Sequence, residues 1–122
     1  NIIFTSNQKN TPQIYLKKGS AQVQQISINK NNITGRISND GSKILYVHGS
    51  RGKYDLMYYN LATAKTIKID SGKILSGSFA PNNNLVAYIK NNSVIIYNLS
   101  TKNSVLLPQL KYKEIFDVKW SK

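Results

Sequence analysis

One stretch of this sequence, residues 33–46, returns 42 positions later as residues 75–88, without insertion or deletion. The first copy reads ITGRISNDGSKILY and the second reads LSGSFAPNNNLVAY. Glycine is matched with glycine at Gly35 and Gly77, and tyrosine with tyrosine at Tyr46 and Tyr88. A fixed period near forty residues, built from short apolar runs between turns, predicts a repeat architecture of strands.

Each full unit contains four expected strands, here termed A to D in chain order. Strand B of each unit is apolar on both faces, which favours a β-propeller, because neighbouring blades cover both faces of a blade. Apolar residues follow no helical period, so no helix is expected. The expected strands are residues 2–5, 13–17, 22–27, 33–38, 43–48, 54–60, 65–70, 75–79, 85–90, 93–98, 104–107 and 115–120.

The units are expected at residues 1–32, 33–74 and 75–114, with a final strand at 115–122. The first unit lacks strand A, and the tail supplies a lone one, since Trp120 follows Phe79 by 41 positions. The predicted fold is therefore all-β: a β-propeller fragment of about three four-stranded antiparallel blades, half of a six-bladed ring. Such a fragment cannot close alone, so we expect two copies to associate head to tail into one ring.

The net charge of +12 raises the question of nucleic-acid binding. Only Arg36 and Arg51 among the 17 basic residues are arginine, the residue best suited to bidentate phosphate and guanine contacts. Lysine, asparagine and isoleucine are all over-used, and all three have A/T-rich codons. Compositional bias therefore explains the charge better than a phosphate-binding surface does, although a basic nucleic-acid-binding β domain stays an alternative.

Other bulk features also limit the possible functions. The absence of cysteine excludes disulfides and thiolate metal sites. No apolar run is long enough to cross a bilayer, so membrane insertion is not expected. The first residues already read like the interior of a repeat, and we expect the N-terminus to be a cut end.

The sequence offers no recognisable catalytic or metal motif. His48 is the single histidine, and no serine lies in a G-x-S-x-G turn. The acidic residues show no motif spacing for acid–base work or metal binding; they are Asp40, Asp55, Asp70, Glu114 and Asp117. No enzyme activity, cofactor or metal is expected, and the strand tyrosines are assigned to packing.

The ordered motifs resemble the repeats of the TolB-type propeller family. Residues 3–6 (IFTS) and 12–15 (PQIY) match its first repeat elements, residues 38–44 (SNDGSKI) and 60–63 (NLAT) its turns, and residues 118–122 (VKWSK) its C-terminal end. The resemblance covers nearly the whole chain. The third unit departs from the family with P-N-N in place of P-D-G, which still permits a turn.

This resemblance implies a non-enzymatic periplasmic interaction module of the Tol–Pal envelope system. In that family the D-to-A loops form the channel mouth where the lipoprotein Pal docks, whereas the contact to TolA comes from an N-terminal segment absent from this chain. Those loops are expected here at residues 29–34, 71–76 and 110–116. The positions implied in Pal binding are Asn31, Ile33, Thr34, Lys73, Leu75, Ser76, Glu114, Phe116 and Asp117.

Two other interpretations stay open at this point. Similar repeats occur in propeller domains of prolyl-oligopeptidase-type peptidases, from which this chain could be a detached part. The lysine- and asparagine-rich loops could also be solvated connectors without a partner.

Overall fold

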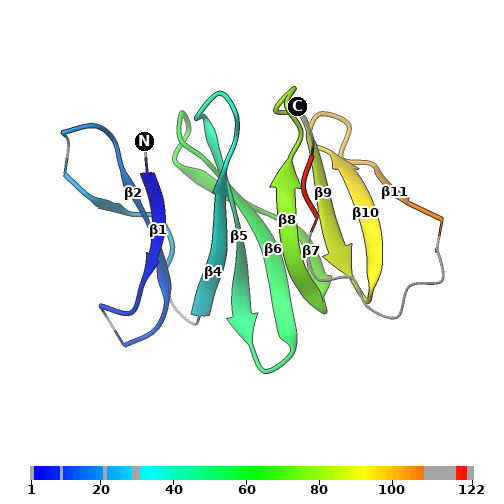
Figure 1. Ribbon diagram of the computed structural model, residues 1–122, viewed down its shortest axis with the longest axis horizontal. Coiled ribbons are helices and arrows are strands. Elements are labelled where there is room, and N and C mark those ends of the chain that lie inside the picture. Colours follow the sequence, from blue (N-terminus) through cyan, green and yellow to red (C-terminus); the bar gives the residue numbers. More distant parts are fainter. Residues whose placement is uncertain (1, 9, 21, 29–30, 109–117, 121–122) are drawn as a thin grey trace.

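Three antiparallel sheets stand side by side in the computed structural model (Figure 1). It describes residues 2–8, 10–20, 22–28, 31–108 and 118–120. Within these residues there are eleven strands and no helix, hence no helix long and apolar enough to span a membrane. The predicted all-β partial propeller is confirmed.

Each sheet is a meander in which strands adjacent in sequence are hydrogen-bonded neighbours. The first sheet contains β1 (Ile2–Ser6), β2 (Gln13–Lys17) and β3 (Gln24–Gln25). The second contains β4 (Asn31–Ile37), β5 (Lys43–Ser50), β6 (Lys53–Asn60) and β7 (Lys65–Gly72). The third contains β8 (Ile74–Phe79), β9 (Leu85–Lys90), β10 (Ser93–Asn98) and β11 (Ser104–Leu106).

The strand expected at residues 22–27 is much shorter than predicted, because only Gln24 and Gln25 are in a strand. The backbone N–H of Ile14 donates to the side-chain Oγ of Ser27 at 2.9 Å rather than to a backbone carbonyl. The backbone N–H of Ile26 still donates to the oxygen of Ile14 at 2.8 Å, but the Ser27 hydroxyl takes the next ladder position, so the regular pairing goes no further.

The final strand expected at 115–122 lies mostly outside the described residues. Residues 118–120 are described and are not in a strand. The indole Nε1 of Trp120 donates to the backbone oxygen of Ser78 at 3.1 Å, so this short segment lies against β8 (Figure 1).

The A-to-B turns of the second and third sheets use different residues for the same two roles. In the second sheet, Oδ1 of Asp40 accepts from the backbone of Ser42 at 3.0 Å, and Gly41 has a φ of 75°. In the third sheet, Oδ1 of Asn82 accepts from the backbone of Asn84 at 3.0 Å, and Asn83 has a φ of 61°. Asparagine can supply the side-chain acceptor and can also adopt a positive φ. The P-N-N sequence of the third sheet therefore forms the same turn as N-D-G in the second sheet.

The core consists of two apolar layers, one between each pair of neighbouring sheets. One layer contains Leu45, Val47, Leu56, Ile74, Phe79, Val86 and Tyr88, and the other contains Ile14, Leu16, Ile26, Ile44, Tyr46 and Tyr59. Successive residues of β5 thus point alternately into the two layers. This explains the continuously apolar B strand, since both of its faces are buried.

Candidate binding surface at the channel mouth

The channel mouth is defined here as the end of the second and third sheets where β4 and β8 begin. The expected loop 71–76 is almost entirely strand, since β7 ends at Gly72, β8 begins at Ile74 and Lys73 alone connects them. β7 extends this far because Gly72 pairs with Tyr54 in the adjacent strand. Five of the predicted site residues lie near the start of the inner strands β4 and β8: Asn31, Ile33, Thr34, Leu75 and Ser76.

Each of the two inner strands carries a β-bulge at this point. The pairing register shifts between Ile33 and Arg36 in β4, and between Ile74 and Gly77 in β8. A bulge adds an unpaired residue and re-aims the side chains around it. The equivalent residues Ile33 and Leu75 are left 36% and 50% exposed.

The remaining predicted residues differ in accessibility. Thr34 is exposed and has a φ of 56°, an unusual value for a β-branched residue. Asn31 is half-buried, Lys73 is exposed and Ser76 is buried. Glu114, Phe116 and Asp117 lie outside the described residues. Because β4 and β8 are in contact, the structure brings the Ile33 and Leu75 segments to the same end of the molecule (Figure 1).

An ion pair that the sequence did not reveal lies close to this mouth. Asp70 on β7 accepts from Lys90 Nζ at 2.9 Å and from the hydroxyl of Tyr88 at 2.8 Å, both on β9. Burial would raise the pKa of Asp70, but the hydrogen bonds from Lys90, Tyr88 and the Ser71 backbone lower it overall. Asp70 is therefore a charged contact between the second and third sheets.

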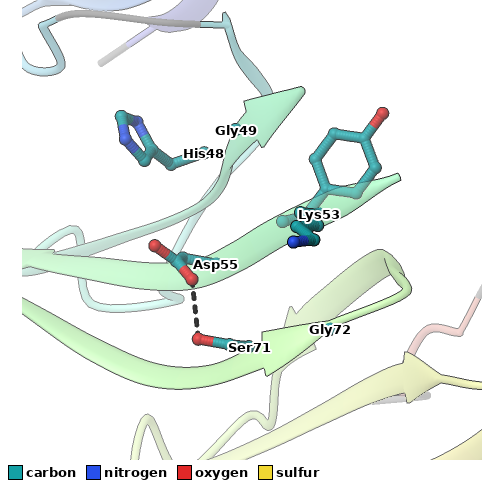
Figure 2. Close-up of a pocket in the computed structure, with 7 residues that line it drawn as sticks. His48, Gly49, Lys53, Asp55, Ser71 and Gly72 are labelled. Carbon is teal, nitrogen blue, oxygen red and sulfur yellow. Dashed lines mark hydrogen bonds between the residues drawn. The ribbon is translucent and has the colours of Figure 1, made fainter. Parts of the chain in front are cut away.

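A second feature missed from the sequence is a cavity of about 410 Å³ beside the mouth (Figure 2). Its lining combines a carboxylate, an imidazole, a hydroxyl and a lysine; the residues are His48, Gly49, Lys53, Tyr54, Asp55, Ser71 and Gly72. The side chains of Asp55 and Ser71 are joined by a hydrogen bond of 2.6 Å. The pairing of β5 with β6 and of β6 with β7 brings these residues together. Their spacing in the sequence does not predict that they lie close to one another.

This cluster does not have the arrangement of a nucleophilic triad. Ser71 Oγ bonds to Asp55, and His48 Nδ1 bonds to Asn32 Oδ1 at 2.7 Å, so no hydrogen bond links the hydroxyl to the imidazole. Nor do three or more potential metal ligands of the histidine, cysteine, aspartate and glutamate types gather within the described part of the chain.

A smaller cavity of about 170 Å³ lies at the opposite rim, where the A-to-B turns gather. It is lined by three residues at equivalent repeat positions, Ile37, Phe79 and Trp120, together with Asn39 and Pro81. Trp120 therefore lies beside the earlier repeats at the place that its spacing predicted.

No model of a known protein family and no curated protein sequence matches this chain. Among solved structures it is similar to TolB from Acinetobacter baumannii, with 27% identity and a TM-score of 0.72, over 93% of this chain and 30% of that one. It is also similar to the β-propeller domain of the Trilobed protease from Pyrococcus furiosus (18% identity, TM-score 0.65, 88% and 39% covered). A prolyl endopeptidase shows a comparable match (17% identity, TM-score 0.62, 79% and 19% covered).

The peptidase likenesses show the fold alone, because their identities are low. The chain spans less than a third of the TolB chain that it resembles. Together with the three stacked sheets, these matches identify the chain as part of a β-propeller.

Proposed function

We propose that this chain is a non-enzymatic interaction module of the TolB type, which acts in the periplasm and binds Pal through the channel mouth. The similarity to TolB over nearly the whole chain supports this assignment above that of a peptidase propeller. The TolB-like motifs at residues 3–6, 12–15 and 118–122 support it independently. The proposal concerns the contact to Pal alone.

The observation that carries the proposal is the exposure of Ile33 and Leu75. These residues lie at the same repeat position, 42 apart, and a bulge leaves each of them accessible at the mouth. Two apolar side chains on rigid strands cost little conformational entropy when a partner covers them. Apolar anchors of this kind, with polar neighbours such as Asn31 and Lys73, give the apolar centre and polar rim that protein interfaces have.

The test is calorimetric titration of the chain with soluble Pal. Ile33→Asp and Leu75→Asp should each weaken binding by about tenfold or more, because a charge replaces a buried apolar contact. Val105→Asp is the matched control, since Val105 is 63% exposed and lies on the outer strand β11. Binding to Pal that neither mouth variant weakens would overturn the proposal, as would a control variant that weakens it equally.

A further inference from the structure

Four polar side chains form a continuous row across the second sheet. The pairing registers match Asn32 with His48, His48 with Asp55, and Asp55 with Ser71, one residue from each of β4 to β7. Residues directly opposite one another in antiparallel strands project from the same face. Figure 2 shows the outer three members of this row, which reach from β5 across β6 to β7.

The hydrogen bonds at the inner end of the row fix the tautomer of the imidazole. Asn32 Nδ2 donates to Gln13 Oε1 at 2.9 Å, so the oxygen of Asn32 is the atom that faces His48. His48 Nδ1 must then carry the hydrogen of its 2.7 Å bond to Asn32 Oδ1. In the neutral ring, Nε2 consequently has no hydrogen and can only accept.

The outer end of the row also offers acceptors. The hydroxyl of Ser71 donates its hydrogen to Asp55 Oδ1 at 2.6 Å. The lone pairs of the Ser71 oxygen can then accept a hydrogen bond from a ligand. Asp55 Oδ2 has no hydrogen-bond donor among the described residues. At this end His48 and Asp55 are partly buried and Ser71 is exposed. The cavity of about 410 Å³ lies over the row here.

We propose that this cavity binds the guanidinium group of an arginine side chain. A carboxylate oxygen, an imidazole lone pair and a hydroxyl oxygen are all acceptors, whereas guanidinium has only donors in a planar array. Tyr54 borders the same cavity, but its ring packs against the apolar layer between the second and third sheets, so recognition rests on the acceptors. Lys53 is the single lysine of the lining, is exposed, and can turn its amine into solvent.

Such a site is distinct from the rest of the surface. The chain has 17 lysines and arginines but only five acidic residues. A cavity rich in hydrogen-bond acceptors is therefore unlike the mainly positive surface around it. The ion pair of Asp70 shows the contrast, because that carboxylate already has Lys90 as its partner, whereas Asp55 has no cationic partner among the described residues. The inference goes beyond Pal binding and does not depend on it, since the ligand is a side-chain group that can be supplied as a small molecule.

The chain has one histidine, so the ring signals of His48 in a two-dimensional NMR spectrum are an unambiguous reporter. The probe is methylguanidinium, titrated at neutral pH. We expect a saturable shift of the His48 signals, and an affinity that is about five- to tenfold weaker in Asp55→Asn, because the charge-assisted hydrogen bond is lost.

Asp40→Asn is the matched control, because it removes the same charge at the opposite rim. Asn82 occupies the equivalent turn position in the third sheet, so asparagine is compatible with the local fold. This variant should bind methylguanidinium like the parent chain. Absence of any saturable shift, or equal affinity of Asp55→Asn and the parent chain, would overturn the inference, whatever the outcome of the Pal titration.

Discussion

The hydroxyl of Tyr88 on β9 donates a 2.8 Å hydrogen bond to Oδ2 of Asp70 on β7 and so joins the third sheet to the outer strand of the second. Tyr88 is 2% exposed and lies in the apolar layer between these sheets. Burial, followed by the adjacent Asp70, raises the pKa of Tyr88. The hydroxyl therefore stays protonated and serves as a fixed donor.

Replacing Tyr88 by phenylalanine should lower the free energy of unfolding by about 1–3 kcal/mol, because Asp70 Oδ2 then loses its donor. Urea denaturation followed by circular dichroism measures this difference. Tyr97→Phe is the control, since no hydrogen bond to the Tyr97 hydroxyl is found within the described residues and its raised pKa has burial as the main cause. Equal stability of Tyr88→Phe and the parent chain would show that the hydroxyl contributes nothing.

Acid should destabilise the chain through Asp70. Its folded-state pKa is lowered, so the unfolded state takes up a proton first as the pH falls. The stabilisation is present above about pH 4, the ordinary value of aspartate, and is lost as the pH falls through the folded pKa. Asp70→Asn should therefore show a smaller loss of urea midpoint between about pH 5 and 3 than the parent chain does.

Some acid sensitivity should remain in Asp70→Asn. Hydrogen bonds from Ser42 and Ser38 lower the pKa of Asp40 to about 2, so this turn also loses stabilisation in acid. An acid profile of Asp70→Asn that coincides with that of the parent chain would contradict the role assigned to Asp70.

The repeated glycines permit a close approach between neighbouring sheets. A Cβ on Gly77 would lie 2.8 Å from Cδ2 of Leu45, and one on Gly35 would lie 2.9 Å from Cγ2 of Ile3. Leu45 is 1% exposed and has little room to move. Gly77→Ala should therefore destabilise the chain by about 1–3 kcal/mol through overpacking.

A second substitution separates this steric effect from other effects of alanine. Leu45→Val removes the atom in conflict, so the double variant Gly77→Ala/Leu45→Val should be more stable than the two single changes predict together. Thermal unfolding of all four proteins measures this coupling. Strict additivity would contradict direct contact as the cause.

The 42-residue period predicted the strands well, because blades repeat both their backbone and their apolar pattern. It failed at residues 22–27, where the Ser27 hydroxyl replaces a ladder partner, and at 71–76, where pairing of Gly72 with Tyr54 extends the strand. The polar row through His48 and Asp55 could not be predicted, since it depends on strand register rather than on spacing. Exposure of Leu75 likewise depends on a bulge.

The expectation of self-association rests on the inner edge of the first sheet. Within the described residues β1 pairs only with β2, and Ile2 on this strand is 63% exposed. We expect two copies of the 122-residue chain to associate, with the tail segment of each completing the other's first blade. Sedimentation should show more dimer as salt rises to about 0.5 M, because screening weakens repulsion between two chains of charge +12.

Ile2→Lys is the variant that tests this edge. The site is exposed, so the fold should be retained, while a lysine at an open edge opposes strand pairing. The variant should sediment as a monomer at salt concentrations where the parent chain is dimeric. A parent chain that stays monomeric at every salt concentration would refute self-association.

The most direct test of the account is to determine which end of the propeller Pal covers. Hydroxyl-radical footprinting with and without soluble Pal reports the accessibility of individual side chains. We predict protection of Ile33 and Leu75 at the mouth, with no change at Pro81 and Trp120 on the opposite rim. Protection of the opposite rim with Ile33 and Leu75 still accessible would contradict the proposed mode of binding.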